Sequence, residues 1–443
     1  MIANARLIAL QALLRVHNNG GYSNIVLNQA LKGAGLGVKD TGFTSALFYG
    51  VLERRMTLDY TIQQYSRIPL KKLSPDVLEI LRLAFFQLCY MDKVPPSAAV
   101  NEAVSLARLR RQGKAAGFIN AVLRSFVRAG SNASLPQGDS RKALSIRYSC
   151  PEWIITLWQN AYGQQTAKRL LEQLAGRPPL VIRANNLKCS AEELSLALEK
   201  GGIPVRAATI EGALEIKDTG SIESNAAFQQ GMFHVQDLAS QICCLALAPK
   251  PGERVIDVCS APGGKAFTIA ERMEDQGELL AFDLYEAKVN LIRKGARRLG
   301  ISILKADVRD AAGPKTLIPP ADRVLCDVPC SGLGILRRKP EIRYKKCESL
   351  DSLPGLQYRI LRSSAGLCKP QGVLLYSTCT LNPAENGRVA DRFLREHPNF
   401  APLPLLLPQQ IIRNSFEPEH QLTLMPHLHG TDGFFFSAFK RLR

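Results

Sequence analysis

The stretch Val255-Ile256-Asp257-Val258-Cys259-Ser260-Ala261-Pro262-Gly263-Gly264-Lys265 decides the fold of this chain. An apolar strand over residues 254–259 runs into a turn with two adjacent glycines, and a helical pattern follows. In doubly wound α/β sheets, ligands bind at such a turn, beyond the carboxyl end of the strand. The glycines let the backbone approach a ligand closely, and the helix N-terminus offers free N–H groups to a carboxylate. The stretch therefore predicts a ligand-binding loop in an α/β domain.

Two common nucleotide-binding motifs do not fit this loop. A phosphate-binding Walker loop would need glycine at Cys259 and a hydroxyl residue after Lys265, where alanine stands. A dinucleotide fingerprint needs Gly-x-Gly-x-x-Gly, which residues 260–265 lack. The loop therefore favours a ligand other than a nucleoside triphosphate or a nicotinamide dinucleotide.

After residue 236, short apolar segments alternate with helical ones, which is typical of a parallel sheet covered on both faces. A closing pair of segments, 422–425 and 434–439, is expected to form a hairpin at the edge of the sheet. The expected strands of the parallel part are 254–259, 278–284, 302–306, 323–327 and 373–378.

Carboxylates follow successive strands of this sheet. Asp283 ends the second strand, where an acid can accept hydrogen bonds from ribose hydroxyls. Asp307 ends the third strand, with Asp310 as a rival three residues later. Each aspartate alone is more commonly a helix cap or a surface acid, but the ordered set together with the Gly-Gly loop favours an adenosine-containing cofactor.

Two cysteines stand at the ends of the fourth and fifth strands: Cys330 within 326–334 and Cys379 within 376–380. A thiolate that adds to carbon 6 of cytosine makes carbon 5 nucleophilic enough to attack an electrophilic methyl group. Asp327 is placed to act as the acid near the base. The pattern favours methyl transfer to carbon over transfer to an exocyclic nitrogen, because 327–330 lacks the aromatic residue of nitrogen-specific motifs. Chemistry alone leaves open which cysteine is the nucleophile.

The first 130 residues predict an all-helical bundle, with Ser74-Pro75 as a cap and Asp40-Thr41 as another. Residues 1–150 hold 20 Lys/Arg against 8 Asp/Glu, in a chain of formal charge +18, which favours a polyanionic partner. The expected helices cover 2–16, the segment through Phe43, Leu47 and Val51, 77–91, 97–111 and 115–128.

The remaining organisation is read from composition. Residues 131–149 are expected to form a linker, because 131–145 is polar and rich in turn residues. Residues 150–236 are expected to form a small α/β adaptor and 237–443 the catalytic domain. Within the adaptor we expect helices at 151–162 and 191–200 and strands at 180–184, 205–207 and 213–216.

Several classes of protein are disfavoured. No apolar run reaches the roughly 18 to 20 residues that cross a bilayer, and the first residues lack the pattern of a signal peptide. The eleven cysteines show no framework spacing and no Cys-x-x-Cys pair, so we expect neither disulfides nor a bound metal. We expect a cytoplasmic protein without a membrane partner.

Three motifs resemble those of the NOL1/NOP2/Sun RNA cytosine-5 methyltransferases, in particular their bacterial 16S rRNA branch: residues 257–265, 327–334 and 376–380. The resemblance implies a Rossmann-like class I methyltransferase domain that uses S-adenosyl-L-methionine. It implies Cys379 as the nucleophile and Cys330 in release of the product. By the same resemblance the cofactor site comprises Cys259, Ser260, Ala261, Pro262, Gly263, Gly264, Lys265, Asp283, Asp307 and Asp327.

The first 130 residues are similar to the NusB antitermination domain, most clearly at 117–124. This likeness implies an RNA-binding domain and favours 16S rRNA, of the type modified at cytosine 967, as the substrate. Thr380 departs mildly from the family, which often has serine there. A basic run after the first cysteine motif is expected to contact RNA phosphates: Arg337, Arg338, Lys339, Arg343 and Lys345.

Two other functions remain open: a non-catalytic RNA-binding or ribosome-assembly factor with the same fold, and a cytosine-5 methyltransferase acting on tRNA. The intact cofactor loop and both cysteines speak against the first. No obligate protein partner is expected, and a monomer is the default.

Overall fold

The structure is a computed structural model that describes residues 4–19, 21–176, 178–217, 221–313, 318–412 and 417–443. The chain divides into two compact units. A helical unit comprises the residues up to 177 together with Leu336–Lys345, and a sheet-containing unit comprises residues 178–335 and 346–443.

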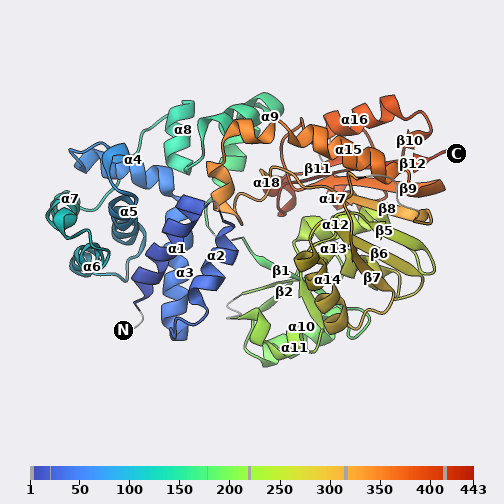
Figure 1. Ribbon diagram of the computed structural model, residues 1–443, viewed down its shortest axis with the longest axis horizontal. Helices are drawn as coiled ribbons and strands as arrows, with labels where there is room; N and C mark the ends of the chain where they lie inside the picture. The colour runs from blue at the N-terminus through green and yellow to red at the C-terminus, as the bar shows by residue number, and fades with distance from the viewer. Residues whose placement is uncertain (1–3, 20, 177, 218–220, 314–317, 413–416) are drawn as a thin grey trace. The chain divides into compact units, whose positions relative to one another are not determined.

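The helical unit confirms the expected all-helical architecture, and in it α1 packs against α3 and α5 around an apolar core (Figure 1). Helices α2, α4 and α8 were not anticipated. Its helices are α1 (Ala5–Asn19), α2 (Ser23–Leu31), α3 (Val38–Glu53), α4 (Arg55–Tyr65), α5 (Pro75–Tyr90), α6 (Pro96–Leu109), α7 (Ala116–Arg128), α8 (Arg141–Tyr148) and α9 (Glu152–Glu172), with short 3-10 turns at Leu70–Lys72, Gly113–Ala115 and Pro340–Tyr344.

Local signals explain where several of these helices begin. Ser74 caps α5 as expected, because its hydroxyl accepts a hydrogen bond from Val77 N at 3.4 Å and proline occupies the first turn. The Asp40-Thr41 cap is wrong: α3 begins earlier, after Gly37, and has no side-chain cap. Helix α8 lies within the expected linker and is capped by Ser140, whose hydroxyl accepts from Ala143 N at 3.2 Å.

Several side chains hold the segment Leu336–Lys345 in the helical unit, and the most deeply buried of them is Arg343. Arg343 is 1% exposed and sits among backbone carbonyl groups. Its guanidinium donates to five carbonyl oxygens, those of Glu53 (2.9 Å), Leu174 (3.1 Å), Leu336 (3.4 Å), Ser149 (3.4 Å) and Tyr148 (3.5 Å). The neighbouring Tyr344 hydroxyl donates to Leu52 O at 2.8 Å.

The sheet-containing unit begins with a small antiparallel sheet in the order β2-β3-β1-β4. Apolar residues of α10 and α11 pack with this sheet into a separate small core. A capping box of Ser190 and Glu193 starts α10. The elements are β1 (Leu180–Ala184), α10 (Ala191–Lys200), β2 (Val205–Ala207), β3 (Ala213–Ile216), α11 (Ala226–Gln229) and β4 (Phe233–Val235), with a 3-10 turn at Ile222–Ser224.

A larger mixed sheet follows, in the order β10-β12-β9-β8-β5-β6-β7, with β11 paired to β12. Strands β7, β6, β5, β8 and β9 are parallel, and β12 runs antiparallel to β9. The expected closing hairpin is confirmed as β11 and β12, whereas β10 was not anticipated. The strands are β5 (Arg254–Asp257), β6 (Glu278–Asp283), β7 (Leu304–Val308), β8 (Ala321–Asp327), β9 (Cys368–Thr378), β10 (Phe400–Pro402), β11 (Gln421–Leu424) and β12 (Phe434–Arg441).

Helices cover both faces of this sheet, as expected. One core gathers apolar residues of α12, α13 and α14 on one face, and another gathers those of α15 and α16 on the opposite face (Figure 1). These helices are α12 (Leu238–Leu247), α13 (Gly264–Arg272), α14 (Glu286–Leu299), α15 (Leu353–Ala365) and α16 (Gly387–Glu396), with short helices α17 (Gln409–Ile412) and α18 (Pro426–His429) and a 3-10 turn at Cys347–Leu350.

The connection order places the functional loops. Strand β5 lies between β6 and β8, so the sheet order reverses at β5, where doubly wound sheets bind ligands. The carboxyl ends of β5, β6, β8 and β9 therefore share one edge. Within the described parts of the chain, none of the helices has the length and apolar character to cross a membrane.

Candidate functional site

The loop between β5 and α13 is held by backbone hydrogen bonds to its neighbours. Val258 N donates to Leu325 O of β8 at 3.1 Å, and Ser260 N donates to Phe282 O of β6 at 2.7 Å. Gly263 ends the loop with a φ of 110°, and a Cβ there would stand 2.4 Å from the Phe267 ring. Glycine is therefore required at this position, and the loop presents the N-terminus of α13 at the edge where strands end.

Asp257 closes β5 as a buried carboxyl group, 1% exposed. Burial and the nearby Asp327 carboxylate raise its pKa from 3.8 to about 7. A raised pKa means that the folded protein binds this proton more tightly than the unfolded chain, so stability falls as pH rises through the interval between the two values.

We therefore expect Asp257→Asn to gain stability relative to the wild-type protein as the pH rises from about 4 to about 8. The difference in free energy of unfolding should grow by roughly 4 kcal/mol at most. Urea unfolding at a series of pH values measures this difference. Asp92→Asn, which alters an exposed carboxylate, is the control. A difference that stays constant with pH would contradict the expectation.

Lys265, the second residue of α13, reaches across to the end of β8. Its ammonium donates to Asp327 Oδ2 at 2.7 Å, and Ser377 Oγ donates to Asp327 Oδ1 at 2.8 Å. Burial opposes the charge on Lys265, but the Asp327 carboxylate together with the nearby Cys243 and Cys244 outweighs it and raises the pKa of the ammonium. The structure thus brings two residues expected at the cofactor site into one ion pair beside the carboxyl ends of β8 and β9.

The expected carboxylates of the second and third strands differ in their surroundings. Asp283 ends β6 and is buried, with Oδ1 3.3 Å from the donor Tyr285 N and 3.6 Å from Lys288 Nζ. Asp307 lies inside β7, because that strand continues to Val308, and its side chain is 77% exposed. Asp310 follows β7 and is also exposed. The choice between Asp307 and Asp310 stays a prediction.

Arg309 is a candidate that the sequence reasoning missed. Its backbone N donates to Asp283 O at 2.9 Å, and its guanidinium lies 5.4 Å from the centre of the Phe282 ring. Two of its nitrogens, Nε and Nη1, are buried without a hydrogen-bond partner among the described residues. Burial lowers the pKa of this guanidinium. The sequence signal that could have identified it is an arginine directly after the third strand, at the edge where the cofactor residues are expected.

The two cysteines meet. Cys330 Sγ and Cys379 Sγ lie 3.1 Å apart, although 49 residues separate them. The contact with Cys379, burial and the charge of Glu385 all raise the pKa of the Cys330 thiol. The raised pKa favours the protonated thiol at Cys330, and either sulfur can donate across the contact.

Gly334 allows the two cysteine loops to approach. Its N–H donates to Cys379 O at 3.1 Å, and a Cβ on Gly334 would stand 1.9 Å from Gly433 O and 2.9 Å from Cys379 O. We expect Gly334→Ala to force the loops apart, to destabilise the protein by about 1–3 kcal/mol and to lower activity. Urea unfolding and turnover measure both effects. Gly355→Ala in α15 is the control, because a Cβ there meets only ordinary contacts; equal behaviour of the two variants would contradict the expectation.

The phosphate-binding role expected for Arg343 is wrong. Arg343 cannot contact RNA in this structure, because its guanidinium is buried and both Nη groups donate to carbonyl oxygens. Lys345 is exposed, and Lys339 Nζ lies 4.8 Å from the centre of the Tyr22 ring. Arg337 donates from Nε to Gly176 O at 3.1 Å. For Arg337, Arg338, Lys339 and Lys345, phosphate binding stays a prediction.

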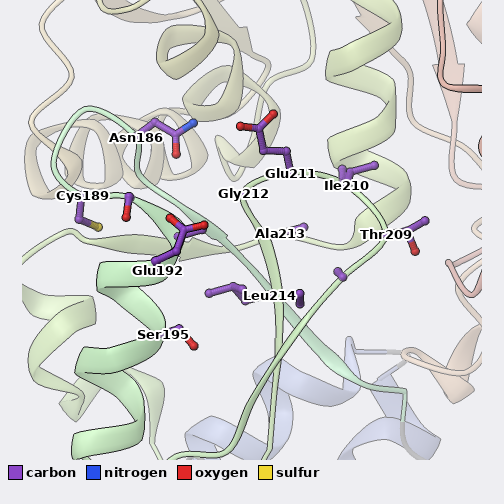
Figure 2. Close-up of a pocket in the computed structure, with 14 residues that line it drawn as sticks. Asn186, Cys189, Glu192, Ser195, Thr209, Ile210, Glu211, Gly212, Ala213 and Leu214 are labelled. Atoms are coloured by element: carbon purple, nitrogen blue, oxygen red, sulfur yellow. The ribbon is translucent and has the colours of Figure 1, made fainter.

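A separate hollow of about 590 Å³ lies on the small sheet (Figure 2). Asn186 and Glu192 line it near the start of α10, and Thr209–Leu214 lines it from the loop into β3. None of the expected site residues is among those that line it. The hollow therefore adds no group to the constellation at the edge of the large sheet.

Comparison with known proteins gives matches to three family models along the chain. Residues 244–440 match the family model described as 16S rRNA methyltransferase RsmB/F. Residues 3–128 match the NusB family, and residues 150–223 match the ferredoxin-like domain of RsmF/B-like methyltransferases. The helical part thus has the relative that the sequence predicted, whereas the ferredoxin-like relative of the small α/β part was not predicted.

Individual relatives cover the whole chain. The probable ribosomal RNA small subunit methyltransferase B of Bacillus subtilis (strain 168) is 37% identical over 99% of both chains. The protein of the same name from Synechocystis sp. (strain ATCC 27184 / PCC 6803 / Kazusa) is 34% identical over 99% of both chains. The crystal structure of PH0851 superposes with a TM-score of 0.84 and 27% identity, covering 100% of this chain and 99% of that one. This chain therefore belongs to the RsmB family of RNA methyltransferases.

Proposed function

We propose that this protein transfers a methyl group from S-adenosyl-L-methionine to carbon 5 of a cytosine in 16S rRNA, through a covalent bond between Cys379 and carbon 6. The observation that carries the proposal is the pair of sulfurs 3.1 Å apart at the ends of adjacent parallel strands, beside the ion pair of Lys265 and Asp327. The substrate is supported by the relatives, which are named for the small ribosomal subunit.

The residues of the cofactor edge fit an adenosine-containing sulfonium compound. The N-terminus of α13 suits a carboxylate, and buried Asp283 suits ribose hydroxyls. The buried, unpaired nitrogens of Arg309 can donate to acceptor atoms of the ligand. When bound, this compound supplies an electrophilic methyl group. No metal site is proposed, and within the described residues no cluster of side chains is suited to one.

The protein's own groups then account for the reaction. The Cys379 sulfur forms a bond to carbon 6 and so makes carbon 5 nucleophilic. Lys265 and Ser377 orient Asp327 toward the cytosine. Its carboxylate stabilises the proton that the base gains near N3 and the amino group. After carbon 5 takes the methyl group, its proton passes to a water molecule, the bond between carbon 6 and sulfur breaks with its electron pair returning to Cys379, and the ring is restored. The family resemblance assigns addition to Cys379 and the release step to Cys330, and the raised pKa of the Cys330 thiol fits that division.

The target base must leave its stack to reach these sulfurs. We propose that the basic helical unit and the exposed part of the 337–345 run hold the RNA backbone while this occurs. We place the activity in the cytoplasm and expect the protein to act as a monomer.

Bisulfite sequencing of 16S rRNA and tRNA from a strain lacking this gene tests the proposal. We expect one 5-methylcytosine in 16S rRNA to disappear, with cytosine 967 the first position to inspect. The purified protein should restore that mark on an unmodified 16S transcript when S-adenosyl-L-methionine is added. A lost mark in tRNA would favour a tRNA enzyme, and no lost mark would favour a non-catalytic assembly factor.

A further inference from the structure

Two consecutive polar residues, Glu385 and Asn386, are buried just before α16 at 0% and 3% exposure. Burial of a carboxylate and an amide is costly unless hydrogen bonds replace those to water. Their partners therefore show what these side chains are positioned to hold. Both sets of partners lie in the loops that carry the two cysteines.

Asn386 binds the chain on both sides of Cys379. The Thr378 hydroxyl donates to Asn386 Oδ1 at 2.7 Å, and Asn386 Nδ2 donates to Thr380 O at 2.9 Å. The residue before the proposed nucleophile and the residue after it are thus attached to one amide group. Since both bonds are buried, they restrict the backbone that sets the direction of the Cys379 side chain.

Glu385 and its neighbour Gln357 do the same for the chain on both sides of Cys330. Ser331 N donates to Glu385 Oε2 at 2.8 Å. Gln357 Nε2 donates to that same oxygen at 2.8 Å and to Pro329 O at 3.1 Å. Gln357 is fully buried as well. The residues flanking the second sulfur are therefore attached to one carboxylate and the amide that it holds.

The two loops are also joined directly. The hydroxyls of Ser331 and Thr380, each the residue after a cysteine, lie 2.7 Å apart. Because Glu385 and Asn386 are adjacent in the chain, neither loop can move far without straining the other. Asn382 Nδ2 donates a hydrogen bond to the other carboxylate oxygen of Glu385, Oε1, at 2.9 Å.

We propose that Glu385 and Asn386 are positioning residues for the methyl transfer. They hold the Cys330 and Cys379 loops in a fixed relative position, here called their register, so that the two sulfurs stay in contact. The inference rests on the proposed function for its catalytic consequence, but the geometric part concerns the two loops alone. The negative charge of Glu385 adds a second effect, because it favours retention of the proton on Cys330. A displacement of about 1 Å at a reacting group lowers turnover by about 10²-fold, so loss of this register should be visible in kcat.

The register is measured first without RNA or cofactor. Diamide takes two electrons and two protons from a pair of thiols, joins the sulfurs as a disulfide and becomes the corresponding hydrazine. Mass spectrometry of the peptide that links Cys330 to Cys379 follows the rate. We expect this link to form readily in the wild-type protein, because the sulfurs lie 3.1 Å apart. We expect Asn386→Ala and Glu385→Ala to slow it by about tenfold or more.

Isosteric and matched variants keep the test interpretable. Glu385→Gln keeps an oxygen that can accept from Ser331 N, so it should cross-link almost as fast as the wild-type protein even if the alanine variants fold poorly. Glu396→Gln removes an exposed carboxylate from the other end of α16 and is the control. Cross-linking of Glu385→Ala and Asn386→Ala at the wild-type rate would overturn the proposal.

Kinetics give the second readout. On 16S transcript we expect Asn386→Ala and Glu385→Ala to lower kcat by about 10²-fold while KM for RNA changes little, since neither side chain contacts the RNA backbone in the proposed complex. Glu385→Gln should recover most of the loss. An unchanged kcat in the alanine variants would overturn the catalytic role. If the wild-type protein itself transferred no methyl group, the proposed function would fail, and the cross-linking rates would still decide the register.

Discussion

Cys379→Ala is expected to abolish methyl transfer, whereas Cys330→Ala is expected to leave the protein covalently bound to its RNA. The first change removes the sulfur that we propose activates carbon 5, and loss of a covalent nucleophile lowers turnover on the order of 10⁴-fold or more. The second change leaves that sulfur in place but removes the thiol 3.1 Å away to which we assign release. The Cys379→Ala variant should therefore form no covalent complex, whereas Cys330→Ala should form one that is not released.

Denaturing gels measure the difference. With RNA that contains 5-azacytidine, which traps the adduct, the wild-type protein should form a complex that survives denaturant and Cys379→Ala should form none. With ordinary RNA and S-adenosyl-L-methionine, only Cys330→Ala should accumulate such a complex. Cys347→Ala, which alters an exposed cysteine, should match the wild-type protein. If Cys330→Ala alone removed the trapped species, the roles of the two cysteines would be reversed.

Arg343→Ala is expected to destabilise the helical unit by several kcal/mol, on the order of 3 to 5, because it leaves buried carbonyl groups without donors. Urea unfolding followed by circular dichroism measures the loss. Arg343→Lys should fall between the wild-type protein and the alanine variant, since one ammonium cannot reach as many oxygens as the planar guanidinium.

Lys345→Ala separates the stability effect from RNA binding. This exposed neighbour should change stability by no more than about 0.5 kcal/mol, yet should weaken RNA binding if it contacts a phosphate. The opposite pattern, with Arg343→Ala as stable as the wild-type protein and defective only in RNA binding, would restore the phosphate-binding role that we reject for Arg343.

The parts of the fold that local signals determine were predicted well. Helix α10 and strands β1, β2 and β3 have the boundaries expected from sequence, because their caps and their turns are encoded in adjacent residues. The parallel order of strands followed from the alternation of strands and helices. Helices α2 and α4 were missed, since neither begins with a side-chain cap and their stability comes from packing on distant parts of the bundle.

The candidate site divides in the same way. Motifs placed Lys265, Asp327, Cys330 and Cys379 at strand ends, and the structure brings them together. What the sequence could not reveal was their pairing across 49 and 62 residues, or the burial of Arg343. An arginine within a basic run is expected to be solvated, and only the three-dimensional arrangement of carbonyl groups around it shows otherwise.

Because the segment Leu336–Lys345 belongs to the helical unit, neither unit can be produced alone by cutting the chain at one point. A chain shortened to begin at Pro178 would retain Leu336 and Ile342, both now buried, with nothing left to cover them. A fragment ending at residue 177 would lack the side chain that saturates its carbonyl groups. Grafting the helical unit onto another enzyme would therefore require moving residues 336–345 together with it.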